Sequence, residues 1–169
     1  MKRLITAAVL FISPLFIFAQ DISGLWKGTM YNDVTKQSLP YELLIKKEKG
    51  KYTGYSYTHF IVAGEDCYGV KKVKVSIAKD GKIVILDNGI LKNTYPILDK
   101  KIKQLNVLDL TNQDNDATLD GPFVTNITRQ FMEVTGHINV KRVPETSESS
   151  LMQYFQKENG VGAVDVAVK

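Results

Sequence analysis

Three side chains with polar tips, Tyr55, Tyr57 and His59, alternate along one run of the chain and are the first candidates for a binding site. Residues two positions apart in a strand lie on the same face. Tyrosine combines an apolar ring with a hydroxyl, which suits a small amphipathic ligand if this face lines a cavity. If the face points outward, it forms a surface for a protein partner. Small residues on the opposite face slightly favour the inward orientation, and both orientations stay open.

Other groupings lack the features that catalysis or metal binding needs. The polar run 112–116 has the alternate spacing of a calcium loop, but Ala117 stands where the turn needs glycine and Phe123 where the bidentate glutamate belongs. The carboxylates near His59 do not have the facing spacing of a zinc site. No Ser-His-Asp set and no glycine-rich phosphate loop can be assigned. The sequence therefore predicts no enzyme, no metal site and no cofactor.

Charge and cysteine content narrow the classes of partner. The formal net charge is +4, and Lys2 and Arg3 account for two of these charges. This is too weak for nucleic-acid binding, which calls for a basic stripe with stacking aromatics. Cys67 is the single cysteine, so no internal disulfide can form. We expect it to be a small buried side chain, with an intermolecular disulfide as the alternative if it is exposed.

Residues 1–19 have the three parts of a cleaved signal peptide. Lys2 and Arg3 give the positive start, the run 4–18 is almost wholly apolar, and Ala19 offers a small residue for cleavage. The run is shorter than the ~20 apolar residues of a membrane span. No cysteine stands directly after this run, so lipid attachment is not expected. The sequence predicts a secreted or periplasmic protein with no transmembrane segment in the mature chain.

Residues 20–144 of the mature chain are predicted to form an antiparallel β-domain. Its apolar residues alternate with polar ones, and Lys49-Gly50-Lys51 and Asp80-Gly81 supply hairpin turns. The expected strands include 24–31, 52–60, 83–86, 102–110 and 129–143. Successive hairpins avoid exposed edges by closing. We therefore predict an all-β, up-and-down barrel of about eight strands.

Two further segments complete this interpretation. The polar stretch 111–120, followed by Gly121-Pro122, is expected to be a long mobile loop. Residues 145–169 are expected to form a helix, with Leu151, Tyr154 and Phe155 on one apolar stripe, and then a short strand from Val161 to Val168. A linker is the alternative for this tail.

The segment Gly24-Leu25-Trp26, close to the expected mature N-terminus, resembles the Gly-x-Trp signature of lipocalin-like (calycin-type) secreted barrels. The resemblance implies an eight-stranded barrel followed by a helix and a short final strand, which is the order read here. It also implies that Arg142, near the end of the last barrel strand, packs over Trp26 at the closed barrel end. In this reading Trp26 and Arg142 are structural residues.

The combined observations favour an exported lipocalin-like protein that holds a small hydrophobic or amphipathic ligand in a barrel cavity. The alternative is a filled barrel that acts as a structural or protein-interaction module of the cell envelope, with an envelope or secreted protein as its partner and no small-molecule ligand. A cavity with an open mouth distinguishes the two.

Overall fold

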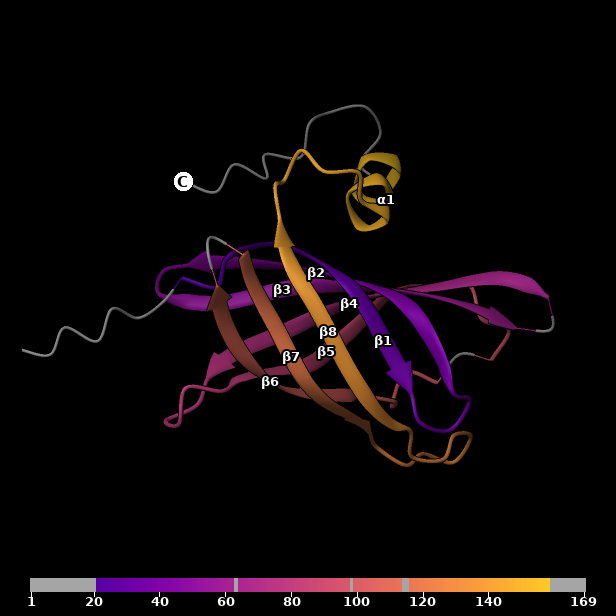
Figure 1. Ribbon diagram of the computed structural model, residues 1–169. Coiled ribbons are helices and arrows are strands. Elements are labelled where there is room, and N and C mark those ends of the chain that lie inside the picture. Colours follow the sequence, from indigo (N-terminus) through magenta and orange to yellow (C-terminus); the bar gives the residue numbers. More distant parts are fainter. Residues whose placement is uncertain (1–20, 63, 98, 114–115, 159–169) are drawn as a thin grey trace, which may run out of the picture.

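Eight antiparallel strands form a closed barrel in the computed structural model, in which each strand pairs with the next and β8 pairs with β1 (Figure 1). The structure describes residues 21–62, 64–97, 99–113 and 116–158. The expected all-β, up-and-down architecture is confirmed. The strands are β1 (Gly24–Asn32), β2 (Gln37–Glu48), β3 (Lys51–Val62), β4 (Glu65–Ile77), β5 (Ile83–Asn93), β6 (Gln104–Gln113), β7 (Asp116–Thr125) and β8 (Thr135–Val143).

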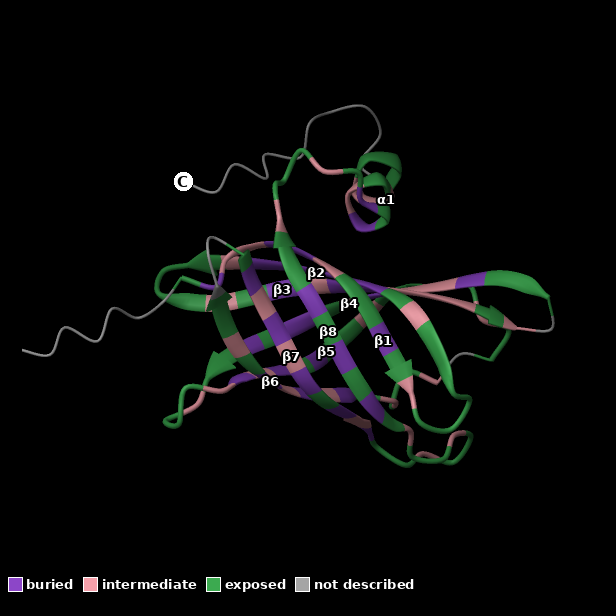
Figure 2. Ribbon diagram, viewed as in Figure 1, coloured by how far each residue is buried: buried purple, intermediate pink, exposed green. Residues whose placement is uncertain are grey.

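Side chains on one face of each strand point inward and fill the barrel. Buried positions alternate with more exposed ones along β7 and most of β8 (Figure 2). The interior cluster contains Trp26, Leu43, Ile45, Ile85 and Ile138, and each of these side chains is fully buried. Burial of apolar surface on this scale is the main force that stabilises such a domain.

Two of the expected hairpin turns are present with the backbone geometry that their residues favour. Lys49 and Gly50 connect β2 to β3 with φ angles of 49° and 76°. Gly81 connects β4 to β5 with a φ of 87°, in the region where glycine alone has no steric cost. These turns fix the register of their hairpins, such as Glu48 opposite Lys51.

The prediction of a long loop over residues 111–122 is wrong, because these residues belong mainly to the β6–β7 hairpin. Thr111 lies opposite Thr118, and Asn112 opposite Ala117, so the polar side chains of this stretch decorate paired strands. Gly121 and Pro122 lie inside β7 rather than in a loop. A Cβ at Gly121 would lie 2.4 Å from the carbonyl oxygen of Val107, so a close approach of β6 requires glycine there.

The expected strand 129–143 is also too long, because β8 begins only at Thr135. Residues 129–134 form part of the β7–β8 connection. The Thr128 hydroxyl accepts hydrogen bonds from the backbone N–H groups of Gln130 and Phe131 and holds this turn. The connection places Phe131 at the open end of the barrel.

One helix, α1 (Ser150–Glu158), lies outside the barrel wall against β2 and β3 (Figure 1). Ser149 caps it, because its hydroxyl accepts a hydrogen bond from the N–H of Met152. The buried carboxylate of Glu42 on β2 accepts bonds from the Ser149 hydroxyl and from the N–H groups of Ser150 and Leu151. A negative charge at a helix N-terminus is favourable, so Glu42 fixes the helix to the wall. The expected leader, residues 1–19, and the expected strand, residues 161–168, lie outside the described residues.

Candidate functional site

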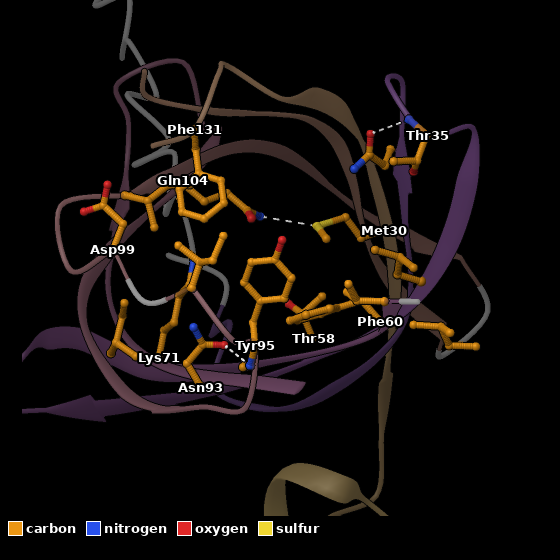
Figure 3. A pocket seen from close by; sticks show the side chains of 18 of the residues that line it. Met30, Thr35, Thr58, Phe60, Lys71, Asn93, Tyr95, Asp99, Gln104 and Phe131 are labelled. Carbon is orange, nitrogen blue, oxygen red and sulfur yellow. Dashed lines mark hydrogen bonds between the residues drawn. The ribbon is translucent and has the colours of Figure 1, made fainter. Parts of the chain in front are cut away.

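One end of the barrel encloses a cavity of about 360 Å³ that is open to the surface (Figure 3). It lies where the connections β1–β2, β3–β4, β5–β6 and β7–β8 meet. Apolar side chains supply much of its wall, and they come from β1, β2, β3 and β5 and from two connections: Met30, Leu39, Phe60, Ile90, Ile97, Ile102 and Phe131. A largely apolar cavity of this size falls in the range of small-molecule sites, which is roughly 300–1,000 Å³.

Three aromatic rings line the mouth of the cavity. Tyr95, from the β5–β6 connection, lies between Phe60 of β3 and Phe131 of the β7–β8 connection (Figure 3). Its ring centroid is 6.0 Å from that of Phe60 and 6.2 Å from that of Phe131. These are the separations of favourable aromatic pairs. The rings provide flat apolar surface at the entrance, and Tyr95 adds a hydroxyl.

A network of polar groups lies at the inner end of the cavity. The Lys71 ammonium contacts the Asp87 carboxylate at 2.5 Å, and the Asp87 side chain is largely buried. The Gln104 side-chain amide donates to Asn106, and the Asn106 amide donates to the Tyr41 hydroxyl. Burial raises the pKa of Tyr41 well above its ordinary value, and the nearby Asp87 charge adds to this shift. Tyr41 therefore stays a neutral hydrogen-bonding group at every physiological pH.

The Asp87 side chain also takes the place of a backbone acceptor where the pairing of β5 with β6 ends. Strands β5 and β6 pair only from Ile83 to Leu86 on the β5 side. Directly after this point the Asp87 carboxylate accepts a hydrogen bond of 2.8 Å from the backbone N–H of Gln104, at the start of β6. This bond satisfies a buried donor that has lost its ladder partner. The residues beyond it on β5 are free to diverge from β6 and to widen the barrel into the cavity.

The opposite end of the barrel is closed by Trp26 and Arg142. The two residues are directly opposed across β1 and β8, and the Arg142 guanidinium lies 4.7 Å from the centroid of the Trp26 ring. Trp26 is fully buried, and its indole N–H donates to the carbonyl of Ile22 at 3.1 Å. Arg142 itself is exposed and donates to the carbonyl of Asp21 at 2.5 Å. The segment before β1 is thereby held across this barrel end.

The structure places Tyr55, Tyr57 and His59 on the outer face of β3, so the favoured inward orientation is wrong. Tyr55 and Tyr57 pack in the cluster that contains Leu151 of α1, and the rings of Tyr55 and Phe155 lie 4.7 Å apart. His59 contacts the exposed carboxylate of Asp66 at 3.1 Å. The other face of β3 points inward, where Thr58 and Phe60 line the cavity. Much of the outer aromatic face is therefore covered by the chain's own helix.

The sequence reasoning missed Lys71, Asp87 and Gln104, although strand parity could have identified the first two. Asp87 is two residues beyond Ile85, and Lys71 is two residues before Val73. Both apolar neighbours point into the core. Period-two alternation therefore predicts that Lys71 and Asp87 also point into the barrel. Buried opposite charges are expected to pair. Gln104 and Phe131 have no comparable pattern around them. Gln104 is the first residue of a strand, and Phe131 lies in a connection.

Cys67 is buried, as predicted from its chemistry, with 4% of its surface exposed. Within the described ranges, no group of three or more histidine, cysteine or acidic side chains is arranged to hold a metal ion. The described part of the chain also contains no helix of the length and apolarity that a bilayer crossing requires.

Comparisons of the chain with protein-family models, with curated proteins and with solved structures returned no match. The functional conclusion therefore depends on the geometry of the barrel and its cavity.

Proposed function

We propose that this chain is an exported, lipocalin-like binding protein that holds a small hydrophobic or amphipathic molecule in the open end of its barrel, and that it performs no catalysis. The observation that carries the proposal is the cavity of about 360 Å³ with apolar walls and a polar inner end. Such a combination binds an apolar body by burial and orients it with a few polar groups.

The two halves of the barrel support this proposal over a filled barrel. Around Trp26 the interior is packed with fully buried side chains such as Leu43 and Ile45. At the other end, Gly69 of β4 lines the cavity, and a Cβ built on it would meet no atom within 4 Å. A structural module would gain stability from filling this space, because an apolar void forfeits dispersion contacts.

Gly69 also supplies the experiment. The change Gly69→Phe places a ring in the cavity, and Lys74→Phe adds the same ring at an exposed position of the same strand as a matched control. Binding is measured by the fluorescence of N-phenyl-1-naphthylamine, an uncharged apolar probe. We expect the unchanged protein and the control to bind the probe, and Gly69→Phe to lose at least about tenfold in affinity. Equal binding by both variants, or no binding by the unchanged protein, contradicts the proposal.

Native mass spectrometry provides a second measurement. Protein purified gently from the cells that produce it is sprayed intact, and a copurified small molecule appears as a discrete added mass. We expect this mass with the unchanged protein and its loss with Gly69→Phe. An added mass that survives this substitution would place the bound molecule outside the cavity.

Export is part of the proposal and follows from the composition of residues 1–19. The intact mass of the protein recovered from its producing cells tests it. We expect a mature chain that begins near Gln20, and we expect Leu10→Arg to leave the full-length chain, because a charge interrupts the apolar run. Recovery of the unchanged protein with residues 1–19 still attached and inside the cell contradicts export.

A further inference from the structure

The geometry points to a specific class of ligand: an apolar body that ends in an uncharged hydrogen-bond acceptor, such as a carbonyl or hydroxyl oxygen, placed against the Lys71 ammonium. A carboxylate head is disfavoured at this position. This inference rests on the proposed binding function and narrows it to the chemistry of one end of the ligand.

Lys71 has donor capacity left for a ligand. An ammonium carries three N–H donors, and among the described residues Lys71 makes one hydrogen bond, to the Asp87 carboxylate at 2.5 Å. The Lys71 side chain lines the cavity and remains 22% exposed there. An acceptor atom on a ligand that fills the cavity can take one of the remaining protons. Hydrogen bonds from a charged donor are the stronger ones.

Asp87 determines which acceptor fits. Its side chain is only 8% exposed, and the same oxygen, Oδ2, accepts from Lys71 and from the Gln104 backbone N–H. The positive charge of Lys71 is therefore already balanced by a fixed buried negative charge. A ligand carboxylate would be desolvated beside that charge without a second buried cation among the described lining residues to offset it, and a ligand ammonium would face Lys71. An uncharged acceptor avoids both costs.

The charges at the rim do not change this balance. Lys92 and Asp99 line the mouth with opposite charges, and Lys92 is exposed to solvent. Solvent screens exposed charges strongly. The inner pair of Lys71 and Asp87 is therefore the part of the cavity that discriminates between head groups.

A series of ligands with one chain length and different heads tests the inference. Decanol, 2-decanone, decanoate and decylamine each compete with N-phenyl-1-naphthylamine for the purified protein at pH 7. We expect decanol and 2-decanone to bind at least about tenfold more tightly than decanoate and decylamine. Equal affinity across the series, or tightest binding of decanoate or decylamine, overturns the inference.

The change Asp87→Asn tests the role of the buried charge. The amide oxygen can still accept from the Gln104 N–H, while the negative charge beside Lys71 is removed. We expect the preference for decanol to weaken or disappear, with the ratio of decanoate to decanol affinity rising by about tenfold or more. The matched control, Asp99→Asn at the rim, should change this ratio by less than about twofold. A similar ratio in all three proteins overturns the inference.

A double variant covers the case in which Asp87→Asn does not fold. Lys71→Met with Asp87→Asn removes both charges together and leaves no unpaired buried ion. We expect the unchanged protein to bind decanol more tightly than the matched hydrocarbon decane. We expect the double variant to bind the naphthylamine probe and to lose this preference. Retention of that preference overturns the inference.

The outcomes also separate this inference from the function on which it rests. Probe binding that Gly69→Phe abolishes, together with no head-group preference, overturns the ligand class and leaves the binding function standing. Absence of binding by the probe and by every member of the series overturns both.

Discussion

Replacement of Trp26 by alanine is expected to destabilise the barrel by about 3–5 kcal/mol, the range for truncating a buried large aromatic side chain. The residue is fully buried, and its indole N–H is bonded to Ile22, which is itself fully buried. Truncation therefore opens a cavity at the closed barrel end and leaves the Ile22 carbonyl without this partner. The second effect places the change in the upper part of the range.

The contribution of Arg142 is separated from that of Trp26 by a double-mutant cycle. Because the guanidinium is exposed, its attraction to the indole ring should contribute about 0.5–1 kcal/mol of coupling. The change Arg142→Ala alone also removes the hydrogen bond to the Asp21 carbonyl and should cost about 1–2 kcal/mol in total. The coupling is expected to be much smaller than the effect of Trp26→Ala alone.

Urea unfolding followed by far-ultraviolet circular dichroism measures these free energies. Fluorescence is unsuitable for the comparison, because Trp26 is the only tryptophan in the chain. The control is Tyr31→Ala, which truncates a more exposed aromatic residue on the same strand and should cost less than about 1 kcal/mol. A loss below about 1 kcal/mol for Trp26→Ala would refute the view that Trp26 stabilises the closed barrel end.

Three further outcomes follow from other contacts. Glu42→Ala removes the hydrogen-bond acceptor at the N-terminus of α1 and should weaken the docking of the helix by about 2–4 kcal/mol. The readout is faster proteolytic cleavage within α1. Unchanged cleavage contradicts the anchoring role of Glu42. For Asp120, burial acts to raise the pKa, but hydrogen bonds with Asn139 and His137 outweigh it and hold the pKa below the ordinary 3.8. The lowered pKa gives a stabilisation that is present above pH 3.8 and lost as pH falls through the folded-state pKa, so the difference between the protein and Asp120→Asn in urea unfolding should shrink on acidification; a pH-independent difference contradicts this. Buried Cys67 should react with Ellman's reagent only slowly until urea unfolds the chain, and rapid reaction of the folded protein contradicts its burial.

The fold was largely predictable because its signals are local. Trp26 and Met30 alternate with polar residues on one strand, and Gly50 and Gly81 mark tight turns whose backbone geometry needs them. Period-two alternation and short connections are sufficient to indicate antiparallel hairpins. Closure then follows from the cost of two exposed sheet edges.

The errors arose where local polarity and tertiary context disagree. The stretch around Asn112 looks like a loop because strand residues on the solvent face are polar, and only pairing with β7 reveals the strand. Gly121 and Pro122 resemble the end of a turn, but Gly121 is required by the approach of the Val107 carbonyl.

The candidate site was less predictable than the fold. Choosing the inner face of β3 depended on the helix α1, which covers Tyr55 and Tyr57 from outside. The cavity draws together residues of β1 to β6 and of three connections, and two register shifts interrupt the pairing of β4 with β5. No spacing along the chain reports such irregularities.

The β1–β8 seam has a consequence for the rate and order of folding. It joins the first and last barrel strands, and the Arg142–Asp21 contact across it spans 121 residues of sequence. Contacts of such separation carry the largest loop-closure entropy, whereas the seven hairpin pairings are local. We expect the seam to form last, after the hairpins have shortened the effective distance between the chain ends. Because the only tryptophan lies in this seam, intrinsic fluorescence should report the time at which the cylinder closes, while circular dichroism reports the earlier pairing of strands.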